Sequence, residues 1–348
     1  MGELRQPARP RLAELSLSNL AFCGMVLLLH LCSDTIAAEP RPTPFYRAVF
    51  CLWQLCSVAV YGFFFLGGLK ACLGRRRPLK EYYLRRLQTV VLPYLVWAVL
   101  YYVVRAVLWH GRFSLPDLLA QLALGAAAPH LYFVIALVQF YLLIPLWRAM
   151  VDRLSPALVL PLLGVASSLL PGLMTWAWQR WLPDVPVYLD RFFMSYLFVW
   201  CAGCYAGAQY ERFSAALKKS RWFVWVLFLL LAGPYLWFCY DSHVNLSWYG
   251  FLTPLMQFYN AAAICAVLAC AQAWQSLMRP WAMQALDRAS YQIYLGHMLP
   301  LLAAPGLIAR LPVSVTPSLH LLLRAAIVLA PTLGLSLLWQ ALRQRRRG

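Results

Sequence analysis

The chain has 348 residues, of which 62% are hydrophobic and only 12% are charged. A soluble domain carries about 25% charged residues, so this composition excludes an ordinary soluble protein and predicts an all-α, polytopic membrane protein. The net charge of +18 is typical of proteins that bind nucleic acid, but the Lys and Arg residues lie in short loops between apolar runs. That distribution is expected for membrane topology and for contact with anionic lipids. We therefore expect the lipid bilayer, and not nucleic acid, as a partner.

Apolar runs of about 20 residues, the length that crosses a bilayer as a helix, predict ten spans. They are residues 17–37, 48–69, 88–109, 130–149, 156–176, 191–210, 221–240, 249–273, 290–309 and 319–340. The runs follow one another without a long linker or a low-complexity tract. We therefore expect a single transmembrane domain over residues 1–348, with a cytoplasmic N-terminal segment at 1–16 and a basic cytoplasmic tail at 341–348.

The Lys and Arg residues predict the orientation, because they concentrate in cytoplasmic loops. With the N-terminus inside, 22 of the 30 Lys and Arg residues fall on the cytoplasmic side. The other eight are Arg41, Arg47, Arg105, Arg112, Arg180, Arg191, Arg310 and Arg324. Both termini are therefore expected in the cytoplasm, and the basic residues Arg5, Arg9 and Arg11 before the first run predict an uncleaved signal anchor.

The first span carries two ionisable residues, His30 and Asp34, in its outer half. They are four residues apart and share one face of a helix, so their side chains can touch. Ionisable groups at membrane depth are costly and often mark a functional site. An imidazole with a neighbouring carboxylate is a simple general base, because the carboxylate fixes the tautomer and favours the protonated form. The alternative is that His30 bonds a backbone carbonyl or faces a small water cavity.

Cysteines and prolines in the spans are interpreted structurally. Cys201 and Cys204 have CxxC spacing, but no second pair accompanies them and they lie in an apolar run. A packing face of small residues is therefore favoured over a metal or redox site. Pro93 and Pro145 are expected to bend their spans and to free backbone carbonyls.

The loop between the second and third spans is rich in arginine. The positive-inside rule is sufficient to explain this charge and is the favoured interpretation. The functional alternative is a clamp for a polyanionic donor, since guanidinium groups bind phosphates bidentately. The candidate residues for that clamp are Arg75, Arg76, Arg77, Lys80, Arg85 and Arg86.

Several stretches, taken in order, carry a resemblance to a known family. They are the His-bearing run at 19–34, Gly62-Phe-Phe-Phe-Leu-Gly-Gly-Leu69, Tyr82-Tyr-Leu-Arg-Arg-Leu-Gln-Thr-Val-Val-Leu-Pro-Tyr-Leu-Val-Trp97, His130-Leu-Tyr-Phe-Val-Ile135 with Tyr141-Leu-Leu-Ile-Pro145, and Ser290-Tyr-Gln-Ile-Tyr-Leu-Gly-His297. No single stretch is specific, but the ordered set over residues 19–297 resembles the acyltransferase-3 family of integral-membrane O-acyltransferases. That family includes bacterial O-acetyltransferases of surface polysaccharides.

Two positions depart from the family pattern. Asn19 stands where an Arg commonly precedes the first-helix histidine by eleven residues, and His30 itself is retained. The basic loop of the family often continues Arg-x-x-Arg, whereas here Thr89 follows Arg86 by three residues.

The resemblance implies transfer of an acyl group, with acetyl expected, from cytoplasmic acyl-CoA to a hydroxyl of a bacterial surface glycan or exopolysaccharide. It implies a multi-pass protein of the bacterial inner membrane, with acetyl-CoA as donor substrate and no bound cofactor. The expected partners are the glycan acceptor and a polysaccharide synthesis or export complex. In this scheme His30, oriented by Asp34, removes the acceptor hydroxyl proton, and such base catalysis typically contributes ~10²–10⁴ in rate.

Polar residues on other spans are candidates for contact with the acceptor: Arg105, His130, Tyr132, His297 and Arg324. For the two histidines, a helix-capping or other structural contact is the favoured alternative. The two arginines either reach a glycan, pair with Asp34, or extend to the lipid headgroups. The Trp- and Tyr-rich outer segment 176–190 is favoured as an interfacial aromatic belt, with sugar stacking as the alternative.

Other reaction classes lack their motifs in the sequence. It contains no GxSxG elbow with a partnered histidine, no Walker-type loop and no metal-ligand constellation, and no two of the six histidines lie close in sequence. Two non-enzymatic functions remain as alternatives: a polysaccharide export or transport protein, and an accessory subunit of a synthesis complex. An exporter needs a continuous polar channel, whereas here the polar groups concentrate near one helix and the two faces, which favours the enzyme.

Overall fold

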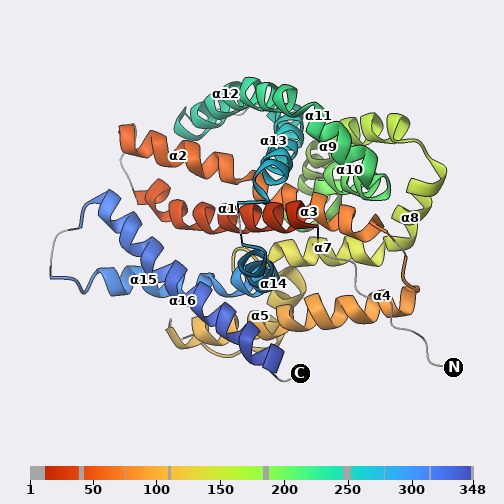
Figure 1. Cartoon of the computed structure of the whole chain (residues 1–348). Helices are drawn as coiled ribbons and strands as arrows, with labels where there is room; N and C mark the ends of the chain where they lie inside the picture. The colour runs from red at the N-terminus through yellow and green to blue at the C-terminus, as the bar shows by residue number, and fades with distance from the viewer. Residues whose placement is uncertain are drawn as a thin grey trace.

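The computed structural model describes residues 12–38, 43–74, 76–108, 111–182, 188–245, 252–277, 279–312 and 315–345. Within these ranges the chain forms helices and no strand, which confirms the predicted all-α class (Figure 1). Arg75 and Arg41 lie outside the described residues, as do Arg5, Arg9 and Arg11 of the predicted signal anchor.

The elements follow one another in this order. The first half holds α1 Ala13–Ala38, α2 Pro44–Cys56, α3 Val58–Cys72, α4 Leu79–Arg86, η1 Leu87–Val91, α5 Leu92–Leu108, α6 Leu115–Leu124, α7 Tyr132–Leu142, α8 Ile144–Arg153 and α9 Pro156–Trp181. The second half holds η2 Leu189–Arg191, η3 Phe193–Tyr196, α10 Leu197–Ala208, α11 Tyr210–Lys219, α12 Arg221–Asn245, α13 Leu252–Trp274, α14 Pro280–Gly296, α15 Met298–Ile308 and α16 Pro317–Arg345.

The described helices have the lengths and composition of membrane spans. Seven helical segments are long and apolar enough to cross a bilayer, or eight when the bent pair α7–α8 counts as one span. Shorter apolar helices at Phe193–Ala208 and Met298–Ile308 cover much of the predicted spans 191–210 and 290–309. The multi-pass membrane class is therefore confirmed, while the number ten and the cytoplasmic location of both termini stay predictions.

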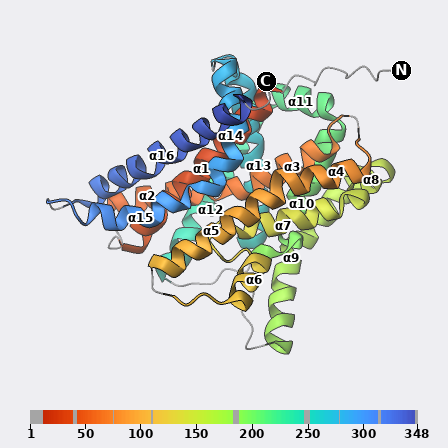
Figure 2. The same ribbon diagram turned by 90° about the horizontal axis from the view of Figure 1, so that it is seen from below.

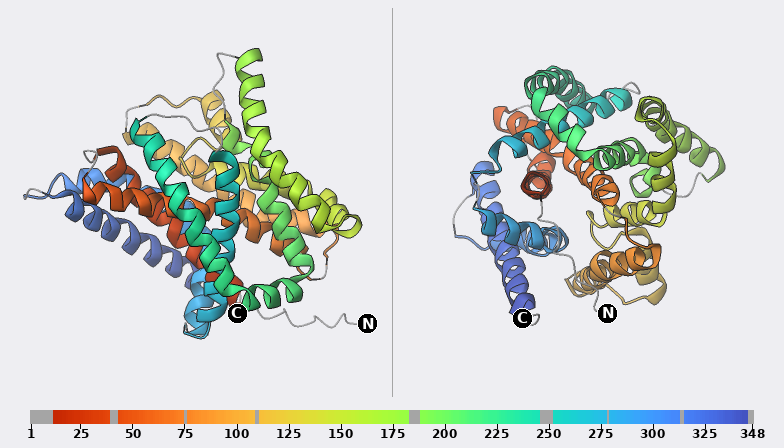
Figure 3. Two further views of the ribbon diagram at one scale, coloured as in Figure 1. Left: turned by 90° about the horizontal axis from the view of Figure 1, so that it is seen from above. Right: turned by 45° about the vertical axis from the view of Figure 1, so that its right-hand side comes forward.

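Helix α1 lies at the centre of the fold. It packs against α2, α3, α13, α14 and α16, and the right-hand view of Figure 3 shows it almost end-on with other helices around it. Its sequence is apolar on nearly every side, which suits a helix enclosed by other helices. The start of α1 and the end of α16 lie at the same end of the molecule, near α11, in Figures 2 and 3.

Helices at the periphery expose apolar residues that suit contact with lipid. Helix α9 extends away from the rest of the molecule (Figure 2). Its exposed side chains recur at helical spacing and are apolar: Leu158, Leu162, Val165, Leu169 and Leu173. In water such a stripe would need a protein partner, but in a bilayer the lipid chains cover it.

Two spans are irregular near their prolines. Helices α7 and α8 meet at an angle of 57°, and Pro145 is the second residue of α8. Because proline lacks an N–H and its ring clashes with the carbonyl four residues earlier, it interrupts a continuous helix. The predicted bend at Pro145 is confirmed. At Pro93, the second residue of α5, the irregularity is the preceding π-helical turn η1.

Glycines bring α3 and α10 into direct backbone contact. A methyl group added at Gly68 would overlap the carbonyl oxygen of Trp200, and one added at Gly203 would overlap the carbonyl oxygen of Phe65. Small residues in membrane helices allow this close approach. Cys201 and Cys204 are free thiols buried beside Gly203, so the predicted packing face at the CxxC spacing is confirmed.

We predict that Gly203→Ala destabilises the protein, because the new methyl group meets backbone atoms that cannot rotate away. Overpacking of this kind typically costs ~1–3 kcal/mol. The control is Gly233→Ala on α12, where an added methyl group meets nothing within 4 Å. Thermal unfolding of the detergent-solubilised protein should show a lower melting temperature for Gly203→Ala only. Equal melting temperatures for the two variants would contradict the close α3–α10 contact.

Candidate functional site

Three of the six histidines, far apart in sequence, come together around α1. The ring centroid of His30 lies 5.1 Å from that of His297 and 6.2 Å from that of His130, and the last two are 4.8 Å apart. His130 is 2% exposed and His297 is fully buried, whereas His30 is half-buried. The structure therefore joins the predicted base His30 to two residues that the sequence suggested only as acceptor contacts. We call this group the histidine cluster.

Each histidine reaches the cluster from a different kind of local structure. His30 lies within the continuous helix α1. His130 follows the reversal after α6, where Gly125 adopts a left-handed backbone with φ of 63°. His297 stands at the junction between α14 and α15. The cluster is thus formed by one helix, one turn and one helix break.

The end of α14 fixes the two buried histidines. The last carbonyls of a helix have no intrahelical donor, and here side chains supply it. The Tyr294 carbonyl is 2.7 Å from Nδ1 of His297, and the Leu295 carbonyl is 3.3 Å from Nε2 of His130. The hydroxyl of Tyr101 on α5 donates to the Leu295 carbonyl at 2.7 Å. In return, the Tyr294 hydroxyl donates to the backbone carbonyl of His130.

Asp34 contacts Arg324 instead of His30. The two side chains form an ion pair in which the Arg324 side chain is 2% exposed and the Asp34 side chain is 50% exposed. Of the three alternatives predicted for Arg324, a glycan, Asp34 or the lipid headgroups, the structure shows Asp34. The predicted orientation of His30 by Asp34 therefore has no direct contact to support it. The Arg324 guanidinium is close enough to act electrostatically on His30.

The position that departs from the family pattern lies toward the other end of α1. Asn19 donates to the Asp287 carboxylate at 2.8 Å and to the Ser290 hydroxyl at 2.9 Å, and Ser16 donates to the same carboxylate at 3.0 Å. Asn19 therefore joins α1 to α14 and is not a member of the histidine cluster.

The arginine-rich loop is engaged by the protein's own groups. Arg76 makes a bidentate pair with Asp152 at 2.5 Å, and Arg77 pairs with Glu81. The Arg86 guanidinium stacks on Tyr141, 4.3 Å from its centroid, and on Tyr82, 5.1 Å away. Lys80 and Arg85 are exposed.

Tyrosine rings connect Arg86 to the histidine cluster. Tyr141, on which Arg86 stacks, lies near Tyr291. The Tyr291 ring is 6.3 Å from the Tyr294 ring, and that ring is 5.2 Å from His130. Tyrosine side chains therefore lie both beside Arg86 and beside His130, with Tyr291 between these two groups.

The other two predicted acceptor residues, Arg105 and Tyr132, make contacts with residues outside the histidine cluster. Arg105 is exposed near the end of α5, with Nη1 3.5 Å from the carbonyls of Ala126 and Ala127. Tyr132 follows His130 by two residues but lies near Tyr196 and Asp190.

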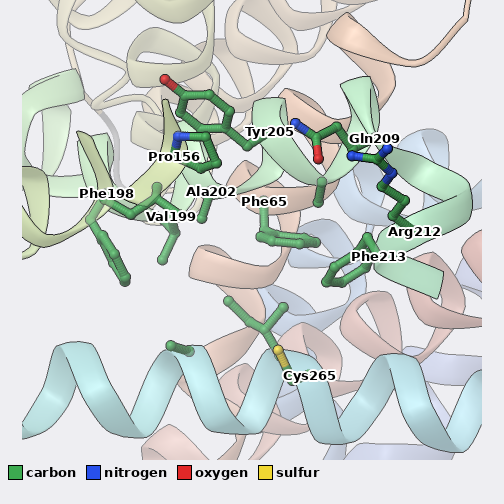
Figure 4. A pocket seen from close by; sticks show the side chains of 14 residues that line it. Phe65, Pro156, Phe198, Val199, Ala202, Tyr205, Gln209, Arg212, Phe213 and Cys265 are labelled. Atoms are coloured by element: carbon green, nitrogen blue, oxygen red, sulfur yellow. The ribbon is translucent and has the colours of Figure 1, made fainter. Parts of the chain in front are cut away.

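A pocket of about 390 Å³ lies elsewhere, between α3, α9, α10, α11 and α13. Figure 4 shows apolar side chains such as Phe65 and Val199 within it, and Tyr205, Gln209 and Arg212 along one rim. No predicted site residue lines this pocket, so we do not assign the reaction to it.

Sequence reasoning missed two residues whose hydroxyls make hydrogen bonds beside the histidine cluster, Tyr101 and Tyr294. Tyr294 precedes His297 by three residues, and this spacing on a helix predicts that the two residues lie on the same face. Tyr101 lies 194 residues from its partner carbonyl, and no local pattern predicts that contact.

The cluster has the parts for proton transfer and for stabilising developing charge. A half-buried imidazole with two buried imidazoles beside it can accept a hydroxyl proton, and the buried Arg324 guanidinium can stabilise an oxyanion. Across the described ranges, no group of three His, Cys, Asp or Glu side chains is arranged to hold a metal ion.

We predict an asymmetric response to breaking the Asp34–Arg324 pair. Asp34→Asn leaves a buried guanidinium without its counter-charge, which costs ~1–3 kcal/mol or more. Arg324→Met leaves only a half-exposed carboxylate and fills the same space with apolar atoms. Melting temperatures should therefore fall more for Asp34→Asn than for Arg324→Met.

Asp152→Asn is the control for that comparison, because it breaks an exposed ion pair with Arg76 and should change the melting temperature little. A larger fall for Arg324→Met than for Asp34→Asn would contradict the burial of the guanidinium.

Comparison with known proteins gives a family and no individual relative. A family model described as "Acyltransferase domain" matches residues 20–339, nearly the whole chain. No curated protein and no solved structure matches the chain.

Proposed function

The chain belongs to the acyltransferase-3 family and is a membrane acyltransferase, and from this premise we propose that it transfers an acetyl group from cytoplasmic acetyl-CoA to a glycan hydroxyl. The proposed acceptor is a bacterial surface or exported polysaccharide, and the proposed location is the bacterial inner membrane. The observation that carries the proposal is the convergence of His30, His130 and His297 beside a buried arginine.

His30 is the general base in this proposal. Among the three histidines it is the one that is only half-buried, so a substrate hydroxyl can approach it. As the hydroxyl oxygen attacks the thioester carbonyl, His30 removes its proton, a contribution typically worth ~10²–10⁴ in rate. Holding both substrates together in a site that excludes water supplies a further part of the acceleration.

Arg324 is proposed to stabilise the oxyanion that forms on the thioester carbonyl. Its guanidinium is buried, and a charge in such a low-dielectric site stabilises an oxyanion more strongly than a charge in water does. In this scheme Asp34 contributes by holding Arg324, a role that replaces direct contact with His30.

The donor is proposed to enter from the basic loop. Arg86 is the favoured phosphate ligand, because it is half-buried and Tyr291 lies between the tyrosines beside it and those beside His130. Arg76, Arg77, Lys80, Arg85 and Arg75 would add positive charge around the CoA phosphates. The acceptor would approach the opposite side of His30, with Arg105 and Tyr132 near its path.

We predict that His30→Ala abolishes glycan O-acetylation without removing the protein from the membrane. The test is a deletion strain complemented with wild type or variant, in which glycan O-acetyl content, glycan export and membrane protein level are all measured. A normal level of His30→Ala protein with exported but unacetylated glycan is the expected result. If acetylation persists and export fails, the protein is an exporter and the enzymatic proposal is wrong.

Arg86→Ala should raise the KM for acetyl-CoA about tenfold while changing kcat little. A hydrogen bond to a charged group contributes ~1.5–3 kcal/mol, and about 1.4 kcal/mol corresponds to a factor of ten. The matched control is Arg221→Ala, because Arg221 also stacks on an aromatic ring, that of Trp222, 5.5 Å away. If the KM for acetyl-CoA is unchanged in Arg86→Ala membranes, Arg86 does not bind the donor and its charge serves only membrane topology.

A further inference from the structure

The protonation of His297 is determined by its neighbour. Nδ1 of His297 is 2.7 Å from the carbonyl oxygen of Tyr294. A carbonyl oxygen can only accept a hydrogen bond, so Nδ1 carries the proton. In the neutral ring Nε2 is then unprotonated and presents a lone pair.

That lone pair has no donor in the described part of the chain. Nε2 of His297 is buried and makes no hydrogen bond there, although buried polar atoms are nearly always paired. The His30 ring lies beside it, with the two centroids 5.1 Å apart and the planes tilted by 42°, and the His130 ring lies 4.8 Å away. Two imidazole rings at this centroid distance come within hydrogen-bonding range when a nitrogen of each ring faces the other.

We propose that His297 is the proton acceptor for His30 during acyl transfer, a role that rests on the proposed function. When His30 takes the acceptor proton, its imidazolium N–H donates to Nε2 of His297, and the proton passes to that nitrogen. The neutral His30 is then regenerated at the moment the tetrahedral intermediate forms.

The step is balanced without any further reagent. The acceptor oxygen forms a bond to the thioester carbon, and the carbon–sulfur bond breaks with its electron pair leaving on sulfur. The proton held by His297 returns through His30 to the thiolate, which leaves as the thiol of CoA. Both histidines end the cycle neutral.

His297 fits this role better than either neighbour does. His130 also has an unpaired buried nitrogen, Nδ1, but its ring is 6.2 Å from His30 and its bond to the Leu295 carbonyl is longer, at 3.3 Å. Asp34, the partner predicted from sequence, is held by Arg324. His297 is therefore the group with both a fixed free lone pair and proximity to His30.

Two substitutions separate proton transfer from structural support. His297→Asn places an amide N–H where Nδ1 donates to the Tyr294 carbonyl and removes Nε2. His297→Gln places an amide oxygen near the position of Nε2, where it accepts a hydrogen bond but cannot hold a proton. The matched control is His243→Asn, since His243 packs on Phe50 away from the cluster.

The assay measures transfer of labelled acetyl from acetyl-CoA to the glycan of native membranes, per mole of protein. We expect kcat to fall ~10²–10³-fold in both His297 variants, with the KM for acetyl-CoA unchanged and with the melting temperature of His297→Asn near that of wild type. His243→Asn should keep its activity. If His297→Asn keeps the wild-type kcat, His297 serves only as a structural contact at the helix end. If His297→Gln keeps the wild-type kcat, His297 serves only as a hydrogen-bond acceptor. Either result overturns the proposal.

A second measurement does not depend on catalysis. The ¹⁵N chemical shifts of His297 in labelled protein should show a protonated Nδ1 and an unprotonated Nε2, and the opposite tautomer would overturn the proposal. Absence of acetyl transfer by the wild type would instead refute the proposed function. The ¹⁵N measurement of the His297 tautomer would remain a valid test in that case, because it does not depend on activity.

Discussion

The candidate site depends on how the last turn of α14 satisfies its backbone carbonyls. Inside a bilayer no water is present to bond them, so protein groups must do so. The carbonyls of Tyr294 and Leu295 obtain donors from His297, His130 and Tyr101. This requirement holds α5 and the turn before α7 against α14. The same hydrogen bonds orient the imidazoles of His130 and His297. The same contacts therefore stabilise the end of α14 and orient the side chains of the candidate site.

Polar contacts hold α1 at both ends while its middle carries His30. Toward the start, Asn19 bonds Asp287 of α14, and near the finish Asp34 pairs with Arg324 of α16. A helix fixed at two levels cannot easily slide or rotate, so the backbone at His30 keeps its position relative to His297. The departure at Asn19 from the family pattern thus concerns the anchoring of α1, at a distance from the histidine cluster.

Local patterns predicted the membrane class, the His30–Asp34 helix face and the bend at Pro145, because each is determined by residues close in sequence. The partner of Asp34 is 290 positions away at Arg324. The sequence offered this pairing as one of three alternatives for Arg324, because no spacing rule separates it from contact with a glycan or with lipid headgroups. The same limit explains why His130 and His297 were predicted only as separate polar contacts. Their convergence is set by the packing of α1 on α14 and by the hydrogen bonds between the turn before α7 and the end of α14. The ordered family resemblance located the residues without showing that they meet.

The glycine contact between α3 and α10 has a consequence for biosynthesis. Gly203 follows Gly68 by 135 residues, so at ~5–20 residues per second α3 waits roughly 7–27 s for its partner helix to emerge. During that time its small-residue face lies against lipid or another inserted helix. The final close packing forms only after the second half of the chain has entered the membrane. Insertion of α10 is therefore the event that commits the first helices to their positions, and a chain truncated before it would leave α3 open to membrane quality-control proteases.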